Sequence, residues 1–198
     1  MIKKLLIAFL LSNVIATAQD NRIPLDTTVV TTNTVSIKGK KVPYTATTGM
    51  QPVWNEHGTI IASLYYTYYK RSDVKNVAKR PLLMSFNGGP GSASVWMHIA
   101  YTGPKVLNID EEAFPIQPYG VKDNPNSILD VADIVYVNPV NTGYSRPVLK
   151  KDEKLDKSLF FGVNADVKYL ASWLTTFMTR NNRWESPKYI IGESYGGT

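Results

Sequence analysis

The chain has 198 residues, 43% of them hydrophobic and 19% charged, and its formal net charge at pH 7 is +6. This composition is that of an ordinary globular domain, which excludes a disordered or low-complexity chain. The absence of cysteine excludes disulfides and thiolate chemistry, and the lysines are scattered, so binding to nucleic acid is not predicted.

The first eighteen residues have the pattern of a secretory signal peptide. A basic start with Lys3 and Lys4 precedes an apolar run from Leu5 to Ile15, and Ala16-Thr17-Ala18 has the small-x-small form of a signal-peptidase site. The run is too short to span a membrane. We therefore expect residues 19–198 to be secreted or periplasmic and not held in a membrane.

The first part of the mature chain is rich in Thr, Val and Tyr and predicts antiparallel strands. Alternation from Thr34 to Val42 is broken by Lys38-Gly39-Lys40-Lys41, which has the form of a hairpin turn. The stretch from Thr59 to Lys70, TIIASLYYTYYK, is strongly β-prone. We interpret its tyrosines as strand packing and not as an aromatic binding site.

After residue 80 the pattern changes to short, unbroken apolar runs. Pro81–Phe86, Ala132–Val137 and Tyr189–Ile191 are typical of strands buried on both faces. Helices are expected between them, a short one from Ser92 to Ala100 and a long one from Ser158 to Thr179. Strands that alternate with helices predict a mostly parallel α/β sheet, which the antiparallel strands precede.

The long helix is expected to turn one apolar face toward the core. Apolar residues recur along it at spacings of four, three, four and three, which follows the helical period. These residues are Val163, Val167, Leu170, Leu174 and Phe177.

A serine motif follows the last apolar run. Gly192-Glu193-Ser194-Tyr195-Gly196 is a Gly-x-Ser-x-Gly sequence, which after a strand builds a sharp turn that exposes the serine hydroxyl. Small residues are needed around the serine because the turn forces close backbone contacts. The pattern predicts Ser194 as a nucleophile and the N–H of Tyr195 as an oxyanion donor, against the alternative of a plain strand-ending turn.

A glycine cluster, Asn87-Gly88-Gly89-Pro90-Gly91, follows the earlier apolar run that ends at Phe86. Glycines let backbone N–H groups approach a substrate closely. A loop of this kind upstream of a nucleophile elbow supplies the second oxyanion donor in α/β-hydrolases. A phosphate or dinucleotide loop fits badly, because there is no G-x-G-x-x-G and no Lys-Ser/Thr after the glycines.

Three segments, FNGGPGSASVW, NPVNTGYSRP and GESYGG, together resemble the serine carboxypeptidase family of the α/β-hydrolase fold, and its cysteine-free bacterial members in particular. The resemblance covers the mature chain from about Val35. It implies an enzyme that removes residues from the C-termini of peptides or proteins, without a metal or an organic cofactor. The only histidines, His57 and His98, have no metal-ligand spacing either.

The resemblance also implies roles for single residues. Ser194 is the expected nucleophile, and the N–H groups of Gly89 and Tyr195 are the expected oxyanion hole. Expected to bind the C-terminal carboxylate of the substrate are Asn87, with Gly88 beside it, and Glu193.

Two positions depart from the pattern of fungal and plant members. Ser85 stands where they have Trp, and Tyr101 stands where they have the Glu of a Glu-x-Gly-Pro segment. That Glu normally shares hydrogen bonds with the residue at position 193. Recognition of the substrate carboxylate is therefore expected to differ from that of those members.

The catalytic base is not expected among these residues. The order in this fold is Ser, then Asp or Glu, then His, whereas His57 and His98 both precede Ser194. We expect residues 19–198 to be the N-terminal part of a single peptidase domain whose Asp and His lie downstream. The alternatives are a proline iminopeptidase-like aminopeptidase, an acyltransferase that uses the same acyl-enzyme, and a catalytically silent fragment.

Overall fold

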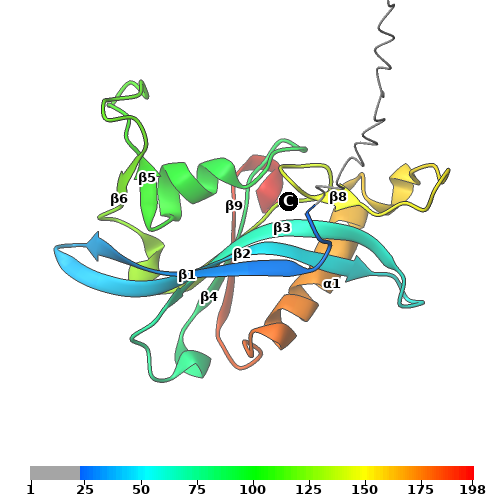
Figure 1. Ribbon diagram of the computed structural model, residues 1–198, viewed down its shortest axis with the longest axis horizontal. Helices are drawn as coiled ribbons and strands as arrows, with labels where there is room; N and C mark the ends of the chain where they lie inside the picture. The colour runs from blue at the N-terminus through cyan, green and yellow to red at the C-terminus, as the bar shows by residue number, and fades with distance from the viewer. Residues whose placement is uncertain (1–22) are drawn as a thin grey trace, which may run out of the picture.

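The computed structural model describes residues 23–198, so the predicted signal peptide and its cleavage site lie outside the described residues. A seven-stranded sheet forms the centre of this part of the chain (Figure 1). Along its main path the strand order is β1-β2-β3-β7-β4-β9, and β8 pairs with β3. The strands are β1 (Thr27–Ile37), β2 (Lys40–Trp54), β3 (Ile60–Arg71), β4 (Leu82–Phe86), β7 (Asp133–Val137), β8 (Arg146–Pro147) and β9 (Lys188–Gly192).

The first three strands form an antiparallel meander, as predicted. Ile37 pairs with Lys40 across the expected hairpin turn, and β3 carries the tyrosine-rich sequence. Tyr66 and Tyr68 point into the core, where both make edge-on contacts with the ring of Phe177. The interpretation of these tyrosines as strand packing is therefore confirmed.

The remaining central strands are parallel, as predicted. β4 lies between β7 and β9 and pairs in parallel with both, while β7 joins the meander by antiparallel pairing with β3. β4 and β7 are buried along their whole length. The prediction of a buried third strand is wrong for these residues, because β9 is the last strand of the sheet and Tyr189 and Ile190 are exposed.

The long helix α1 (Val163–Arg180) starts five residues later than predicted. Lys157–Leu159 form a separate 3₁₀ turn, η4, which the side chain of Asp156 caps. Gly162 then has φ +124, a backbone conformation that a helix interior cannot accommodate. The helix therefore begins only after this glycine.

The apolar face predicted for α1 is wrong in part. The helix packs on the sheet through three aromatic residues spaced by four, Tyr169, Trp173 and Phe177, all of them buried. Val163 and Val167 are exposed. The apolar residues and the aromatic residues both recur with the helical period, on adjacent faces of this helix. The aromatic face packs on the core because the larger side chains bury more apolar area.

The opposite face of the sheet is covered by a short π-helix, η2 (Met97–Thr102). Met97 packs there with Leu83, Ile134 and Tyr136, which alternate along their strands with residues that face α1. The short helix predicted from Ser92 to Ala100 thus has different bounds. Helix η2 leads into a small hairpin of β5 (Lys105–Leu107) and β6 (Val121–Asp123), which projects from the body in Figure 1.

A buried ionic cluster holds the amino ends of the central strands together. Asp133, fully buried at the start of β7, accepts hydrogen bonds from Arg80 Nε at 2.7 Å and from Arg183 Nη1 at 2.5 Å. The N–H of Arg71 donates to the same carboxylate at 2.9 Å, and Arg183 also donates to the hydroxyl of Tyr68. Segments before β4, within β3 and after α1 therefore meet at one carboxylate.

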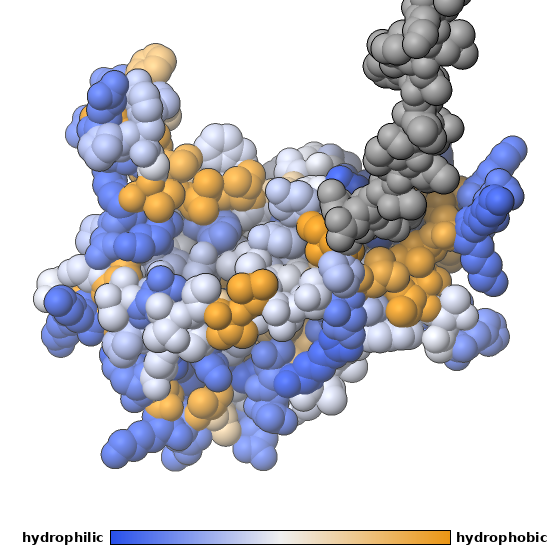
Figure 2. Space-filling view, in the orientation of Figure 1, coloured by the Kyte–Doolittle hydropathy of each residue, from blue (hydrophilic) through white to orange (hydrophobic). Residues whose placement is uncertain are grey.

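The face drawn in Figure 2 is mainly hydrophilic, with an apolar group over β1, where the exposed residues include Val29 and Val30. Within residues 23–198, no helix has the length and hydropathy needed to cross a bilayer. The same part of the chain contains no group of three or more side chains placed to hold a metal ion.

Candidate active site

The serine motif forms the predicted strand-to-turn elbow. β9 ends at Gly192, and the 3₁₀ turn η5 (Ser194–Gly197) begins two residues later. Ser194 itself has φ +54, a left-handed conformation that non-glycine residues seldom adopt. A backbone conformation of this kind costs about 1–3 kcal/mol, which the surrounding structure must offset. Such strained residues cluster at functional sites.

The glycines of the motif are required by space. A Cβ at Gly192 would lie 1.9 Å from the carbonyl oxygen of Gly196, and a Cβ at Gly196 would lie 2.7 Å from the carbonyl oxygens of Phe86 and Asn87. The first contact is inside the elbow, whereas the second is with the end of β4. Small residues at these positions therefore let the elbow close and pack on the neighbouring strand.

The glycine loop after β4 contacts the elbow directly. A Cβ at Gly88 would lie 2.7 Å from Cβ of Ser194 and 3.2 Å from its Oγ. The next residue, Gly89, has φ +121, so a side chain there would be strained whatever the space. The structure thus brings the two predicted motifs together around the serine hydroxyl.

Asn87 and Glu193 join the two motifs through their side chains. Asn87 Nδ2 donates a hydrogen bond of 3.0 Å to Glu193 Oε2. Asn87 Oδ1 accepts a hydrogen bond of 3.1 Å from the N–H of Met97, at the start of η2. Asn87 is almost fully buried, so its orientation is fixed on both sides of its amide.

The two N–H groups predicted to hold an oxyanion are available. Gly89 lies next to Gly88, and Tyr195 directly follows Ser194. Within residues 23–198, the N–H groups of Gly89 and Tyr195 take part in no backbone hydrogen bond between loops or elements. Gly89 is exposed and Tyr195 is half-buried, so both N–H groups are open to solvent or to a bound acceptor.

The third motif, which follows β7, supports the glycine loop. Asn138 Oδ1 accepts a hydrogen bond of 3.0 Å from the N–H of Ser94, and Ser94 Oγ donates to the carbonyl of Val137 at 2.6 Å. Gly143 is needed here, because a Cβ would lie 2.3 Å from Asn138 Nδ2. The loop therefore fixes the segment between the glycines and η2.

Neither histidine is set up as a base for Ser194. The ring of His98 stacks on Tyr136, and its Nε2 lies 2.6 Å from the hydroxyl oxygen of Tyr69. Burial lowers the pKa of His98 to about 4. His57 lies in the exposed turn between β2 and β3. Among residues 23–198, no side chain makes a hydrogen bond with the Ser194 hydroxyl.

The two departures from the family pattern have visible consequences. Ser85 is fully buried, and its Oγ is the one buried side-chain polar atom of the described residues without a hydrogen-bond partner. Tyr101, on η2, has an exposed side chain. Glu193 is paired with Asn87 alone, and the Tyr101 position contributes no carboxylate to the pair.

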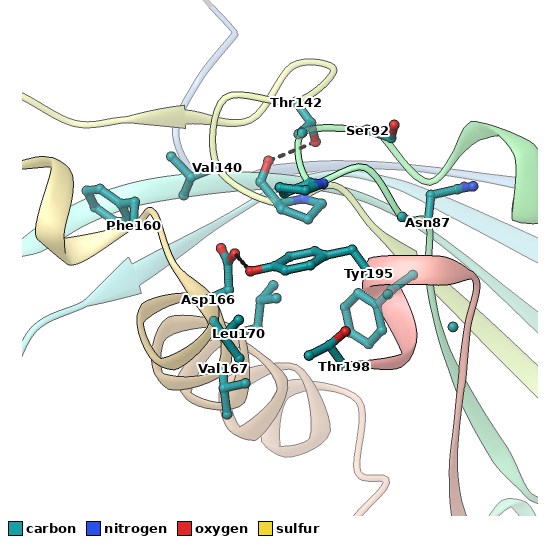
Figure 3. A pocket seen from close by; sticks show the side chains of 18 of the residues that line it. Asn87, Ser92, Val140, Thr142, Phe160, Asp166, Val167, Leu170, Tyr195 and Thr198 are labelled. Atoms are coloured by element: carbon teal, nitrogen blue, oxygen red, sulfur yellow. Dashed lines mark hydrogen bonds between the residues drawn. The ribbon is translucent and has the colours of Figure 1, made fainter.

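A cavity of about 820 Å³ adjoins the elbow (Figure 3). Its walls include Asn87 and Gly88 of the glycine loop and Tyr195 and Gly196 of the elbow. The remaining wall is mainly apolar, and four of the five helix residues predicted to face the core line it. They are Val163, Val167, Leu170 and Leu174.

One charged residue on the cavity wall was not identified from the sequence. Asp166, in the first turn of α1, accepts hydrogen bonds from the hydroxyls of Tyr195 and Tyr169, both at 2.8 Å. The i, i+3 spacing of Asp166 and Tyr169 on one helix was the available signal. The contact with Tyr195 joins α1 to η5, and no local sequence pattern predicts a contact between two such elements.

Comparisons with known proteins show the family to which the chain belongs. The family model described as "Serine carboxypeptidase" matches residues 38–198. The chain is 28% identical over 156 residues to "Serine carboxypeptidase S10 family member 1" from Dictyostelium discoideum, covering 77% of this chain and 33% of the relative. It is 32% identical over 135 residues to the human "Retinoid-inducible serine carboxypeptidase", covering 67% of this chain and 26% of the relative.

A solved structure supports the fold. A prohormone-processing carboxypeptidase from Saccharomyces cerevisiae superposes with a TM-score of 0.61 at 22% identity, covering 77% of this chain and 32% of the other. The predicted fold class is thus confirmed. The chain spans about a third or less of the length of these relatives. These relatives come from eukaryotes, so they give no support to a bacterial type.

Proposed function

The chain belongs to the serine carboxypeptidase family, and from that premise we propose that the whole protein releases C-terminal residues from peptides through an acyl-enzyme on Ser194. The observation that carries the proposal is the strained Ser194, with φ +54, enclosed between two glycine motifs. A Cβ at Gly88 would lie 3.2 Å from the hydroxyl oxygen of Ser194. A side chain at position 88 would therefore crowd the hydroxyl of Ser194.

The proposed chemistry is acyl transfer in two steps. Ser194 Oγ attacks the scissile carbonyl carbon and gives its proton to a base, while the carbonyl oxygen becomes an oxyanion held by the N–H groups of Gly89 and Tyr195. The C–N bond then breaks, and the amine leaves with a proton. Water next attacks the ester carbonyl, which frees the new C-terminal carboxylate and restores the Ser194 hydroxyl.

Specificity for the chain end is assigned to Asn87 and Glu193, with the backbone at Gly88 beside them. The amide of Asn87 is fixed by its bonds to Glu193 and to the N–H of Met97. A carboxyl at Glu193 can donate a hydrogen bond to the substrate carboxylate only when it carries a proton. Recognition by this pair accounts for the removal of residues from a free C-terminus.

We propose that the catalytic Asp and His come from parts of the protein outside residues 23–198. Support comes from the absence of a base at Ser194 within the described residues and from relatives of which the match covers only about a third. The described residues then form one portion of a single peptidase domain. No cofactor or metal has a part in this chemistry.

We also propose that residues 1–18 direct export and are removed, which would leave Gln19 first. The support is the basic start, the apolar run and Ala16-Thr17-Ala18. The lack of cysteine is compatible with the periplasm of a bacterium, so a secreted or periplasmic enzyme of bacterial type is part of this proposal.

The test of the proposed function is the identity of the first product. The full-length protein is incubated with an unblocked peptide, the same peptide amidated at its C-terminus, and the same peptide acetylated at its N-terminus. We expect release of single C-terminal residues from the unblocked and acetylated peptides and little from the amidated one. Release of N-terminal residues would instead show an aminopeptidase, and product formed only with an added alcohol or amine would show an acyltransferase.

A further inference from the structure

We propose that Asp166 is a positioning residue for catalysis, which holds the hydroxyl of Tyr195 so that the N–H of Tyr195 keeps its direction toward the oxyanion. The inference rests on the proposed function of Ser194 and deepens it. Asp166 is on α1, whereas Tyr195 is in the elbow (Figure 3). The contact therefore ties the turn that carries the nucleophile to a separate element.

The pair has the geometry of a strong hydrogen bond. Tyr195 Oη donates to Asp166 Oδ2 at 2.8 Å, and in Figure 3 the tyrosine ring spans the cavity to reach the carboxylate. Hydrogen bonds to ionised acceptors are about twice as strong as those between neutral groups. The bond to Asp166 is also the main reason that the pKa of Tyr195 is raised, which keeps the hydroxyl protonated as a donor.

Asp166 is itself anchored on its other oxygen. Tyr169 Oη donates to Asp166 Oδ1 at 2.8 Å, and the same hydroxyl accepts a hydrogen bond of 3.1 Å from the N–H of Val140. Tyr169 is buried against Phe160. The carboxylate is thus held by a rigid helix and by the loop after β7, so it can act as a fixed point.

The elbow needs such a fixed point. Helix η5 is a single turn, and the side chain of Glu193, at its N-cap, makes no capping hydrogen bond. Gly196 and Gly197 follow Tyr195 directly, and glycine allows the backbone many conformations. The N–H of Tyr195 has no partner among the backbone bonds of residues 23–198 that would fix its direction. The side-chain hydroxyl supplies that restraint.

The test compares two single variants, their double variant and one control variant in the full-length enzyme, with two readouts. Asp166→Asn removes the charge and one acceptor, whereas Tyr195→Phe removes only the hydroxyl. The matched control is Asp156→Asn, which makes the same chemical change at an exposed residue ten positions earlier that caps η4. The readouts are kcat and KM for a peptide, and the second-order rate at which a fluorophosphonate labels Ser194.

We expect Asp166→Asn and Tyr195→Phe each to lower kcat and the labelling rate about tenfold, with KM changed less than twofold, because the oxyanion forms only in the transition state. The double variant should be no slower than either single one, since both act through the same bond. Asp156→Asn should match the wild type.

Several results would overturn the inference. Additive losses in the double variant would show that Asp166 does not act through Tyr195, and a rise in KM alone would show a role in substrate binding. Unchanged labelling in Tyr195→Phe would also contradict it, even if Asp166→Asn fails to fold. A wild type that labels but releases no C-terminal residue contradicts only the proposed function, and a wild-type Ser194 that does not label contradicts both.

Discussion

The side chain of Asn87, on the loop after β4, donates a 3.0 Å hydrogen bond to the carboxyl of Glu193, the residue before the strained serine. Two segments more than a hundred residues apart are therefore joined by the groups assigned to the substrate's C-terminus. The same Asn87 accepts the N–H of Met97, so η2 belongs to the arrangement. The residues proposed to recognise the chain end and the proposed nucleophile are therefore structurally linked.

The first prediction concerns Glu193. An ionised carboxylate at this position repels the ionised C-terminus of a peptide. Glu193→Gln keeps an oxygen that accepts the hydrogen bond from Asn87, and it supplies an N–H donor to the substrate carboxylate. A hydrogen bond to such a charged group contributes about 1–3 kcal/mol to binding. We expect kcat/KM at pH 8 to rise about tenfold for a peptide with a free C-terminus and to change little for its amidated form. Equal effects on both peptides would limit Glu193 to a structural role, and Glu185→Gln, in an exposed loop, is the control.

The second prediction concerns the contact between the glycine loop and Ser194. A Cβ at Gly88 would lie 2.7 Å from Cβ of Ser194, whereas a Cβ at Gly197 would have an ordinary contact at 3.8 Å. A displacement of about 1 Å at a reacting group costs about a hundredfold in rate. Gly88→Ala should therefore lower kcat/KM about a hundredfold, and Gly197→Ala should retain most activity. Similar losses in both variants would point to general sensitivity of the elbow.

The sequence predicted the strands well because their signals are local. The tyrosine-rich alternation of β3 and the apolar runs of β4 and β7 reflect burial that each strand has by itself. The prediction of buried residues failed where burial depends on the neighbouring elements. Tyr189 belongs to an apolar run that is typical of a buried strand, but it is exposed on the last strand of the described sheet. Val167 follows the helical period of the apolar residues in α1, but it faces the cavity.

The site was predictable to the extent that it uses backbone. Gly192 and Gly196 are needed because a side chain at either position would clash with nearby backbone, so the motif alone predicts the turn. Contacts between distant side chains left no local pattern. The bond from Tyr195 to Asp166 and the packing of His98 on Tyr136 both depend on how elements meet in space.

The third prediction concerns stability. Asp133→Asn would leave Arg80 and Arg183 without their buried anion, and removal of one partner from a buried ion pair costs about 3–5 kcal/mol. Asp130→Asn is the control, because its ion pair with Lys38 is at the surface. Urea unfolding of the full-length protein should show a large fall in the midpoint for Asp133→Asn only. Equal midpoints for the two variants would show that solvent or rearrangement satisfies the arginines.

The fourth prediction concerns pH. Burial lowers the pKa of His98 to about 4 from its ordinary value of 6.5, so the folded protein favours the neutral ring and unfolding takes up a proton between these values. The stabilising contribution is complete above pH 6.5 and is lost as the pH falls toward 4, by up to about 3 kcal/mol. His98→Phe should flatten the dependence of unfolding free energy on pH in this window. An unchanged slope in His98→Phe, or a flattened one in the exposed control His57→Gln, would assign the effect to other groups.

The most direct test of the account is to trap the acyl-enzyme on Ser194. The full-length protein is mixed with an activated ester substrate, quenched in acid within milliseconds to seconds, digested and analysed by mass spectrometry. We expect the fragment that contains Ser194 to carry the acyl group in the wild type, and Ser194→Ala to show neither the adduct nor turnover. Substrate turnover by Ser194→Ala at the wild-type rate, or an adduct on a different residue, would contradict the assignment of Ser194 as the nucleophile.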